Sequence, residues 1–164
     1  MSRGFVKEDD QEEVPMVAPR AHLPRGVTNY VTPAGMEQLL AERKSMLDEI
    51  AQLDASNEKE RRIAVNHINA RIALLDERIS SARLVRPEDL PGDEVRFGAI
   101  VKMRMGNETQ VFQIVGVDEA DISKGKIAFT SPLAKALTHR KVGDIVVLKR
   151  PSGDAVFEIL HIGA

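Results

Sequence analysis

Apolar residues at helical spacing dominate the first half of the chain. One seam runs from Met36 to Leu53, with Arg43 as its polar member. A second seam has spacings that alternate between three and four residues: Val65, Ile68, Ile72, Leu75, Ile79, Ala82. Alternating spacings of this kind are the a/d pattern of a coiled coil. Residues 54–62 between the seams are polar, which predicts an antiparallel helical hairpin with arms about 30 Å long.

Capping residues mark where these helices begin and end. Thr32 suits the capping position of the first helix, and Pro33 suits its first turn. Asn57 is expected to cap the second helix, with Glu60 completing a capping box. Two prolines and a glycine in residues 86–93 end the hairpin.

The second half of the chain has the short, β-branched runs that are typical of strands. Strands are expected at 95–103, 109–117, 127–130, 145–148 and 155–162, and a short helix at 132–139. Together these elements predict a small antiparallel sheet packed with one helix. The expected fold class is therefore α+β, with an antiparallel coiled-coil hairpin followed by this sheet domain.

These patterns divide the chain into four parts. A flexible or extended tail is expected at 1–29, the hairpin at 30–85, a linker at 86–94 and the sheet domain at 95–164. The tail carries an acidic run from Glu8 to Glu13. That run is interpreted either as a solvated segment or as a docking segment for a partner.

Composition narrows the classes of function. The net charge of −2 differs from the basic charge of most nucleic-acid-binding domains, and aromatic residues make up only 4% of the chain. Nucleic acid is therefore expected only indirectly, through a protein partner. The chain has no cysteine, and its four histidines lack metal-ligand spacing, so no metal site of its own is expected. We expect no membrane span and no signal sequence, and hence a cytoplasmic protein.

Two groups of motifs, taken in order, resemble the GreA/GreB family of bacterial transcript-cleavage and elongation factors. The first is the opening Tyr30–Leu39, with its Thr-Pro-Ala-Gly. The second is Thr-Ser-Pro-Leu-Ala-Lys-Ala-Leu at 130–137, followed by Val-Gly-Asp at 142–144 and Pro-Ser-Gly at 151–153. The resemblance covers about residues 30–162.

The resemblance implies an FKBP-like C-terminal domain that docks on the rim of the secondary channel of RNA polymerase. Thr130, Ser131, Pro132 and Leu133 are the residues it implies for that contact. It also implies that the hairpin enters the channel and that the chain is an accessory factor without enzymatic activity of its own. The two seams joined by a short break favour pairing within one chain, so a monomer is expected. Acidic residues at the hairpin tip then help to hold a Mg²⁺ shared with the polymerase active site, and no other cofactor is implied.

The tip departs from the family pattern, which usually reads Gly-Asp-Leu-Ser-Glu-Asn-Ala-Glu-Tyr. The nearest match here is Leu53–Glu60, and neither alignment keeps both family acids: one puts Ala51 and Asp54 at them, the other Asp54 and Asn57. Each arm is also about two helical turns shorter. Asp54 and Glu58 are the candidate tip acids, and the competing interpretation makes them turn and capping residues.

The function therefore has alternatives. The first is a factor that stimulates transcript cleavage. The second is a regulator or inhibitor that occupies the channel without stimulating cleavage. Two other classes are a peptidyl-prolyl isomerase, suggested by the FKBP-like fold, and a scaffold that dimerises through its coiled coil. The second half offers only phenylalanines as pocket rings, and strand positions can absorb all of them: Phe97, Phe112, Phe129, Phe157.

Overall fold

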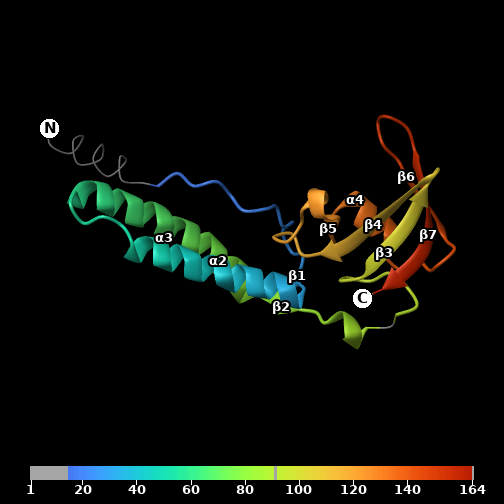
Figure 1. Cartoon of the computed structure of the whole chain (residues 1–164), viewed down its shortest axis with the longest axis horizontal. Helices are drawn as coiled ribbons and strands as arrows, with labels where there is room; N and C mark the ends of the chain where they lie inside the picture. The colour runs from blue at the N-terminus through green and yellow to red at the C-terminus, as the bar shows by residue number, and fades with distance from the viewer. Residues whose placement is uncertain (1–14, 91, 164) are drawn as a thin grey trace. The chain divides into compact units, whose positions relative to one another are not determined.

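The computed structural model describes residues 15–90 and 92–163, which fall into two compact units (Figure 1). The first contains residues 39–80 and the N-terminal residues up to 20, and the second contains residues 21–38 and 81 onward. The boundaries of these two units differ from the domain boundaries expected from the sequence. The expected boundaries stay predictions. The acidic run Glu8–Glu13 lies outside the described residues. No helix in the described part is long and apolar enough to span a membrane.

The first unit is a helical hairpin, formed by α2 (Pro33–Ala51) from Leu39 onward and by α3 (Glu58–Ser81). Its buried apolar residues all belong to the two predicted seams: Leu39, Met46, Ile68, Ile72, Leu75. Other predicted seam residues, such as Ile50 and Val65, are only partly buried. The polar seam residue Arg43 reaches outward, and its Nε lies 2.7 Å from Oδ1 of Asp76. Arg71 lies 3.8 Å from Glu49, so residue numbers rise along α2 as they fall along α3. The helices are therefore antiparallel, as predicted.

Arg20 ties the segment before the hairpin to α2. Its two terminal nitrogens donate to the two carboxylate oxygens of Glu42, at 3.0 and 2.9 Å. Two parallel bonds between a guanidinium and a carboxylate fix direction as well as distance. The Arg20 side chain is only 17% exposed, so this end of the predicted tail is held against the helix.

The second unit contains a five-stranded sheet in the order β5-β4-β3-β7-β6. Its strands are β3 (Ile100–Met105), β4 (Glu108–Val115), β5 (Lys126–Ala128), β6 (Ile145–Leu148) and β7 (Ala155–Gly163). The helix α4 (Pro132–Leu137) packs with it, and the unit also contains two 3-10 helices, η1 (Pro87–Asp89) and η2 (Ile122–Lys124). The α+β class expected from the sequence is confirmed. Neighbouring strands are antiparallel except that β5 runs parallel to β4, which the pattern did not indicate.

The core of this unit lies between the sheet and α4. It is built from aliphatic side chains and one aromatic ring, as the composition requires: Val101, Met103, Ile114, Ala134, Leu137, Val146, Phe157, Ile159. Phe97, Phe112 and Phe129 are only partly buried against this core. The expectation that strand positions absorb all four phenylalanines therefore holds fully for Phe157 alone.

The predicted strand 95–103 is shorter than expected, because it begins at Ile100. A turn precedes it: the Ala99 N–H donates to the Arg96 carbonyl at 3.0 Å, and Gly98 has a φ of 86°. Only glycine adopts that conformation readily. The second helix also ends early, at Ser81.

Ala82, the last residue of the predicted seam, lies in a strand and not in the helix. It begins β2 (Ala82–Leu84), which pairs in parallel with β1 (Asn29–Val31). The partner of Ala82 is Asn29. The residues just before the hairpin in sequence are thus hydrogen-bonded to the residues just after it, within the second unit.

The first turn of α2 is capped by a residue far away in the sequence. The hydroxyl of Thr32 accepts from the Gly35 N–H at 3.0 Å, which confirms the predicted cap. In a capping box the third helical residue would return a carboxylate to the cap N–H, but that residue is Gly35. The carboxylate of Glu119 takes this role, accepting from the Thr32 N–H at 3.1 Å and also from the Thr32 hydroxyl. It accepts from the Gly116 N–H at 3.1 Å as well.

We expect Glu119→Ala to lower the free energy of unfolding by about 1–3 kcal/mol, because buried N–H groups of Thr32 and Gly116 lose their acceptor. Gly35→Ala should destabilise the fold too, since its new Cβ would lie 2.2 Å from Cδ of Glu119. Urea unfolding followed by circular dichroism measures both changes. The exposed carboxylate variant Glu108→Ala is the control and should change stability by less than about 0.5 kcal/mol. Equal effects of Glu119→Ala and this control would contradict the capping role.

Candidate functional site

The turn between α2 and α3 holds the first candidate site. Asp54 is exposed and organises this turn: one carboxylate oxygen accepts from the Ser56 N–H at 2.9 Å and the other from the Ser56 hydroxyl at 2.8 Å. The backbone bond from Ser56, and then the hydroxyl bond, hold the pKa of Asp54 below its ordinary value of 3.8. The carboxylate is therefore ionised at neutral pH and points its charge at solvent.

Glu58 follows in the first turn of α3 and is also exposed. Asn57 precedes it, and its side-chain oxygen accepts from the Glu60 N–H at 3.1 Å, as expected of a cap. Acidic residues suit this position because the start of a helix carries partial positive charge. The tip thus presents Asp54 and Glu58 as exposed acids, held by bonds that are local in sequence.

An apolar groove of about 370 Å³ lies beside this turn, between the two helices. Leu53, Ile63 and Ile68 line it together with Glu49, Glu60 and His67. No group of three or more histidine, cysteine or acidic side chains arranged to hold a metal occurs in residues 15–90 and 92–163.

The second candidate site surrounds the start of α4. Ser131 caps the helix, with its hydroxyl accepting from the Ala134 N–H at 3.2 Å, and Pro132 occupies the first turn. Pro132 is exposed, whereas Thr130 and Leu133 are partly buried. Ser131 therefore acts as the helix cap. The exposed side of this segment, at Pro132, faces solvent.

Three aromatic rings meet next to this segment. Tyr30, Phe97 and Phe129 have centroids 5.6–5.7 Å apart and meet at tilted or edge-on angles, arrangements that aromatic pairs prefer. They line an open pocket of about 370 Å³ with Ile114 as a further apolar wall. Sequence reasoning missed this pocket, because Tyr30 comes from β1, far from the other rings in the sequence.

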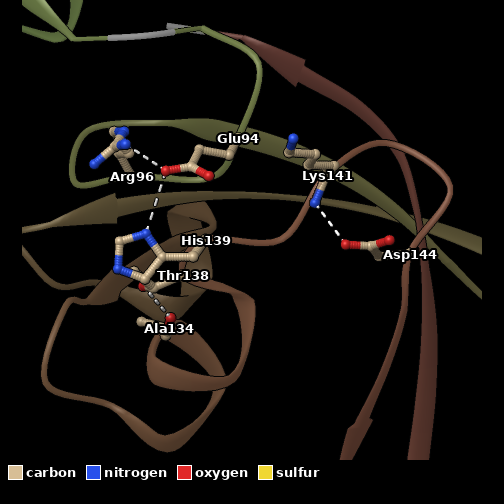
Figure 2. Close-up of polar contacts among 7 residues, drawn as sticks. All are labelled: Glu94, Arg96, Ala134, Thr138, His139, Lys141 and Asp144. Atoms are coloured by element: carbon tan, nitrogen blue, oxygen red, sulfur yellow. Dashed lines mark hydrogen bonds and ion pairs between the residues drawn. The ribbon is translucent and has the colours of Figure 1, made fainter.

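Polar side chains from the end of α4 form the remaining wall of this aromatic pocket: Lys135, Thr138 and His139. The Thr138 hydroxyl donates to the Ala134 carbonyl at 2.7 Å (Figure 2). Lys135 and His139 are exposed. The pocket therefore has aromatic walls and the cationic side chain of Lys135 at its edge.

His139 is held in an unusual conformation at that edge. Its φ is 71°, in the left-handed region that non-glycine residues seldom adopt. The His139 N–H donates to the Val95 carbonyl at 2.8 Å, and its Nδ1 lies 3.3 Å from the Glu94 carboxylate (Figure 2). Glu94 also pairs with Arg96. These contacts fix the imidazole beside the pocket.

Comparisons with known proteins relate the chain to one family. The family model "Transcription elongation factor, GreA/GreB, C-term" matches residues 90–164. Transcription elongation factor GreA of Acidiphilium cryptum is 42% identical over 118 residues, covering 71% of this chain and 72% of the relative. GreA of Rhodospirillum rubrum is 34% identical over 154 residues, covering 80% and 95%.

Two solved structures are also similar. The "GreA factor homolog 1" protein of Thermus thermophilus is 24% identical, with a TM-score of 0.40 over 84% of this chain and 100% of the other. A GreA/GreB factor of Nitrosomonas europaea is 20% identical, with a TM-score of 0.42 over 82% and 98%.

The bonds at the tip predict a measurable titration. Because the pKa of Asp54 is lower in the folded chain, its stabilising effect is present above the unfolded pKa and is lost as pH falls through the folded pKa. Ser56→Ala removes the hydroxyl bond and keeps the backbone bond, so the pKa of Asp54 should rise and still stay below 3.8. Carboxyl ¹³C NMR titration measures it.

Asp121 provides the internal control for this titration. The hydroxyl of Ser123 lowers its pKa in the same manner. Ser56→Ala should leave the Asp121 titration unchanged. An Asp54 titration that does not move in this variant would mean that the turn geometry does not persist in solution.

Proposed function

The chain belongs to the GreA/GreB family of transcription elongation factors, and we propose that it binds RNA polymerase in the cytoplasm and stimulates cleavage of backtracked transcripts. It would do so as a monomeric accessory factor at the secondary channel. The observation that carries this proposal is the pair of exposed acids, Asp54 and Glu58, at the turn of a helical hairpin. A narrow arm with acids at its end suits a metal site buried in another protein.

The chemistry of the tip fits a shared Mg²⁺. Each oxygen of Asp54 accepts one bond from Ser56, and a carboxylate oxygen has two acceptor sites. One site on each oxygen therefore stays available for a cation. Mg²⁺ prefers such hard oxygen ligands, and a second metal stabilises the attacking and leaving oxygens of phosphoryl chemistry. Glu58 would supply the other carboxylate.

The docking surface is assigned to the aromatic pocket together with Thr130, Ser131, Pro132 and Leu133. The pocket's rings suit an apolar side chain of the polymerase, because aromatic walls provide large contact areas at small entropic cost. Lys135 at its edge suits an acidic neighbour of that side chain. Ser131 shapes the surface by holding the first turn of α4.

A second candidate function is a regulator that occupies the channel without stimulating cleavage. The engagement of both Asp54 oxygens by Ser56 favours it, because a carboxylate held by its own turn is less free to reorient toward a metal. The two candidates share the docking surface and differ only in the chemistry of the tip.

Transcript cleavage by a stalled, backtracked RNA polymerase complex separates the two functions. With Mg²⁺ held constant, the protein should shorten the 3′ end of the RNA, and Asp54→Ala/Glu58→Ala should abolish this effect because no tip carboxylate then reaches the metal. Asp121→Ala is the matched control, since Asp121 is likewise held by a serine. It should cleave as the wild type does.

No cleavage by the wild-type chain, combined with competition against an active cleavage factor, would establish the channel-occupying regulator. Neither cleavage nor competition would overturn the polymerase proposal. Cleavage that survives loss of both tip acids would remove Asp54 and Glu58 from the mechanism.

Lys135→Glu should weaken binding to RNA polymerase by about tenfold, mostly by slowing association, because it reverses a charge at the edge of the pocket. Fluorescence anisotropy of the labelled protein with core polymerase measures this. Lys124→Glu, an exposed reversal on η2, is the control with the same change in net charge. Equal weakening by both variants would indicate a general charge effect and contradict the assigned docking surface.

A further inference from the structure

Strand β6 is the last strand of the five-stranded sheet and forms one of its edges. Within residues 92–163, β7 is its neighbour on one side and no strand lies on the other. The Ile159 N–H donates to the Asp144 carbonyl at 3.0 Å. Bonded and non-bonded pairs alternate along an antiparallel ladder, so Ile145 and Val147 direct their N–H and C=O groups toward the open edge.

The same two residues also expose apolar side chains. Ile145 is 53% exposed and Val147 is 49% exposed, whereas Val146 between them is buried at 1%. Val156 lies directly opposite Val147 on β7 and is 49% exposed. Side chains opposite each other on neighbouring strands share a face, so these three form a small apolar patch along the edge.

Cations stand at both ends of this edge. Arg140 and Lys141 precede β6, and Lys149 and Arg150 follow it, and all four are exposed. The acids in residues 140–154 are Asp144 and Asp154, fewer than the cations. Asp144 is engaged in the turn before the strand, where its carboxylate accepts from the Lys141 N–H at 2.8 Å (Figure 2).

We propose that the β6 edge binds an extended acidic segment of another protein as an added strand. Backbone groups of Ile145 and Val147 would pair with the segment, and its apolar side chains would extend the patch. Strand addition of this kind takes its affinity from main-chain hydrogen bonds. Acidic residues at the ends of the segment would face the flanking cations.

The cations that flank β6 favour an acidic segment over a second copy of the chain. Two β6 edges side by side would bring the cationic flanks of both copies together, and like charges on an exposed edge oppose edge-to-edge association. The acidic residues of a bound segment would instead be attracted to these cations. The site shares no residue with the aromatic pocket or the hairpin tip, so it does not depend on the polymerase proposal.

The probe is the peptide Glu-Glu-Val-Thr-Val-Glu-Glu with blocked ends, added to the ¹⁵N-labelled full chain. Amide exchange of Ile145 and Val147 should slow on binding, whereas that of Val146, which faces β7, should stay as it was. The matched peptide Lys-Lys-Val-Thr-Val-Lys-Lys should not bind. Single-stranded RNA of equal charge is the third arm, and it should not slow exchange at Ile145 and Val147.

Two variants test the geometry. Val147→Pro removes one outward N–H without touching a bond to β7, and it should weaken peptide binding about fivefold, the value of one hydrogen bond. Lys149→Glu/Arg150→Glu should weaken it about tenfold. Val111→Thr, an exposed position on β4, is the control and should bind normally.

Several results would overturn the inference. They are absence of acidic-peptide binding at millimolar concentration, binding without slowed exchange at Ile145 and Val147, equal binding of the basic peptide, and self-association of the chain through this edge in light scattering.

Discussion

The hydrogen bonds to the buried carboxylate of Glu119 are the interaction on which the second unit most depends. Glu119 is only 7% exposed, and a buried carboxylate is costly unless hydrogen bonds replace its water. Here the replacement donors are the Thr32 N–H, the Thr32 hydroxyl and the Gly116 N–H. The two bonds from Thr32 join residues that are 87 positions apart in sequence, whereas the Gly116 bond spans three residues. They supply to α2 the cap that its own third residue, Gly35, cannot provide.

That arrangement constrains the residues around it. A Cβ at Gly35 would overlap the Glu119 side chain, and one at Gly116 would lie 2.5 Å from the Tyr30 carbonyl oxygen. Both positions therefore need glycine for close approach rather than for backbone freedom. Because β1 passes so near Gly116, the ring of Tyr30 can meet Phe97 and Phe129. The aromatic pocket is thus a consequence of the same packing that caps the helix.

Sequence patterns predicted the features that depend on neighbours in the chain. The hairpin seam, the Thr32 and Asn57 caps and most strands follow from period and capping chemistry, and the structure has them. The pocket was missed because no period links Tyr30 to Phe97. The strand expected at 95–103 was too long because Val-Arg-Phe alternates like a strand, while the turn at Gly98 depends on contacts elsewhere, including the bond from its N–H to Ile114. The roles of Asp54 and Glu58 stay predictions, since exposure alone does not assign chemistry.

The two candidate sites differ in what holds them, and this difference bears on how each can vary. The tip is maintained by bonds spanning two or three residues, from Ser56 to Asp54 and from Glu60 to Asn57. Such a turn can change its acids without disturbing the rest of the fold. The aromatic pocket instead joins β1, β4 and α4 with neighbouring segments, so a change there disturbs core packing. This chain can therefore depart from the tip sequence that the resemblance implies while keeping its second unit intact.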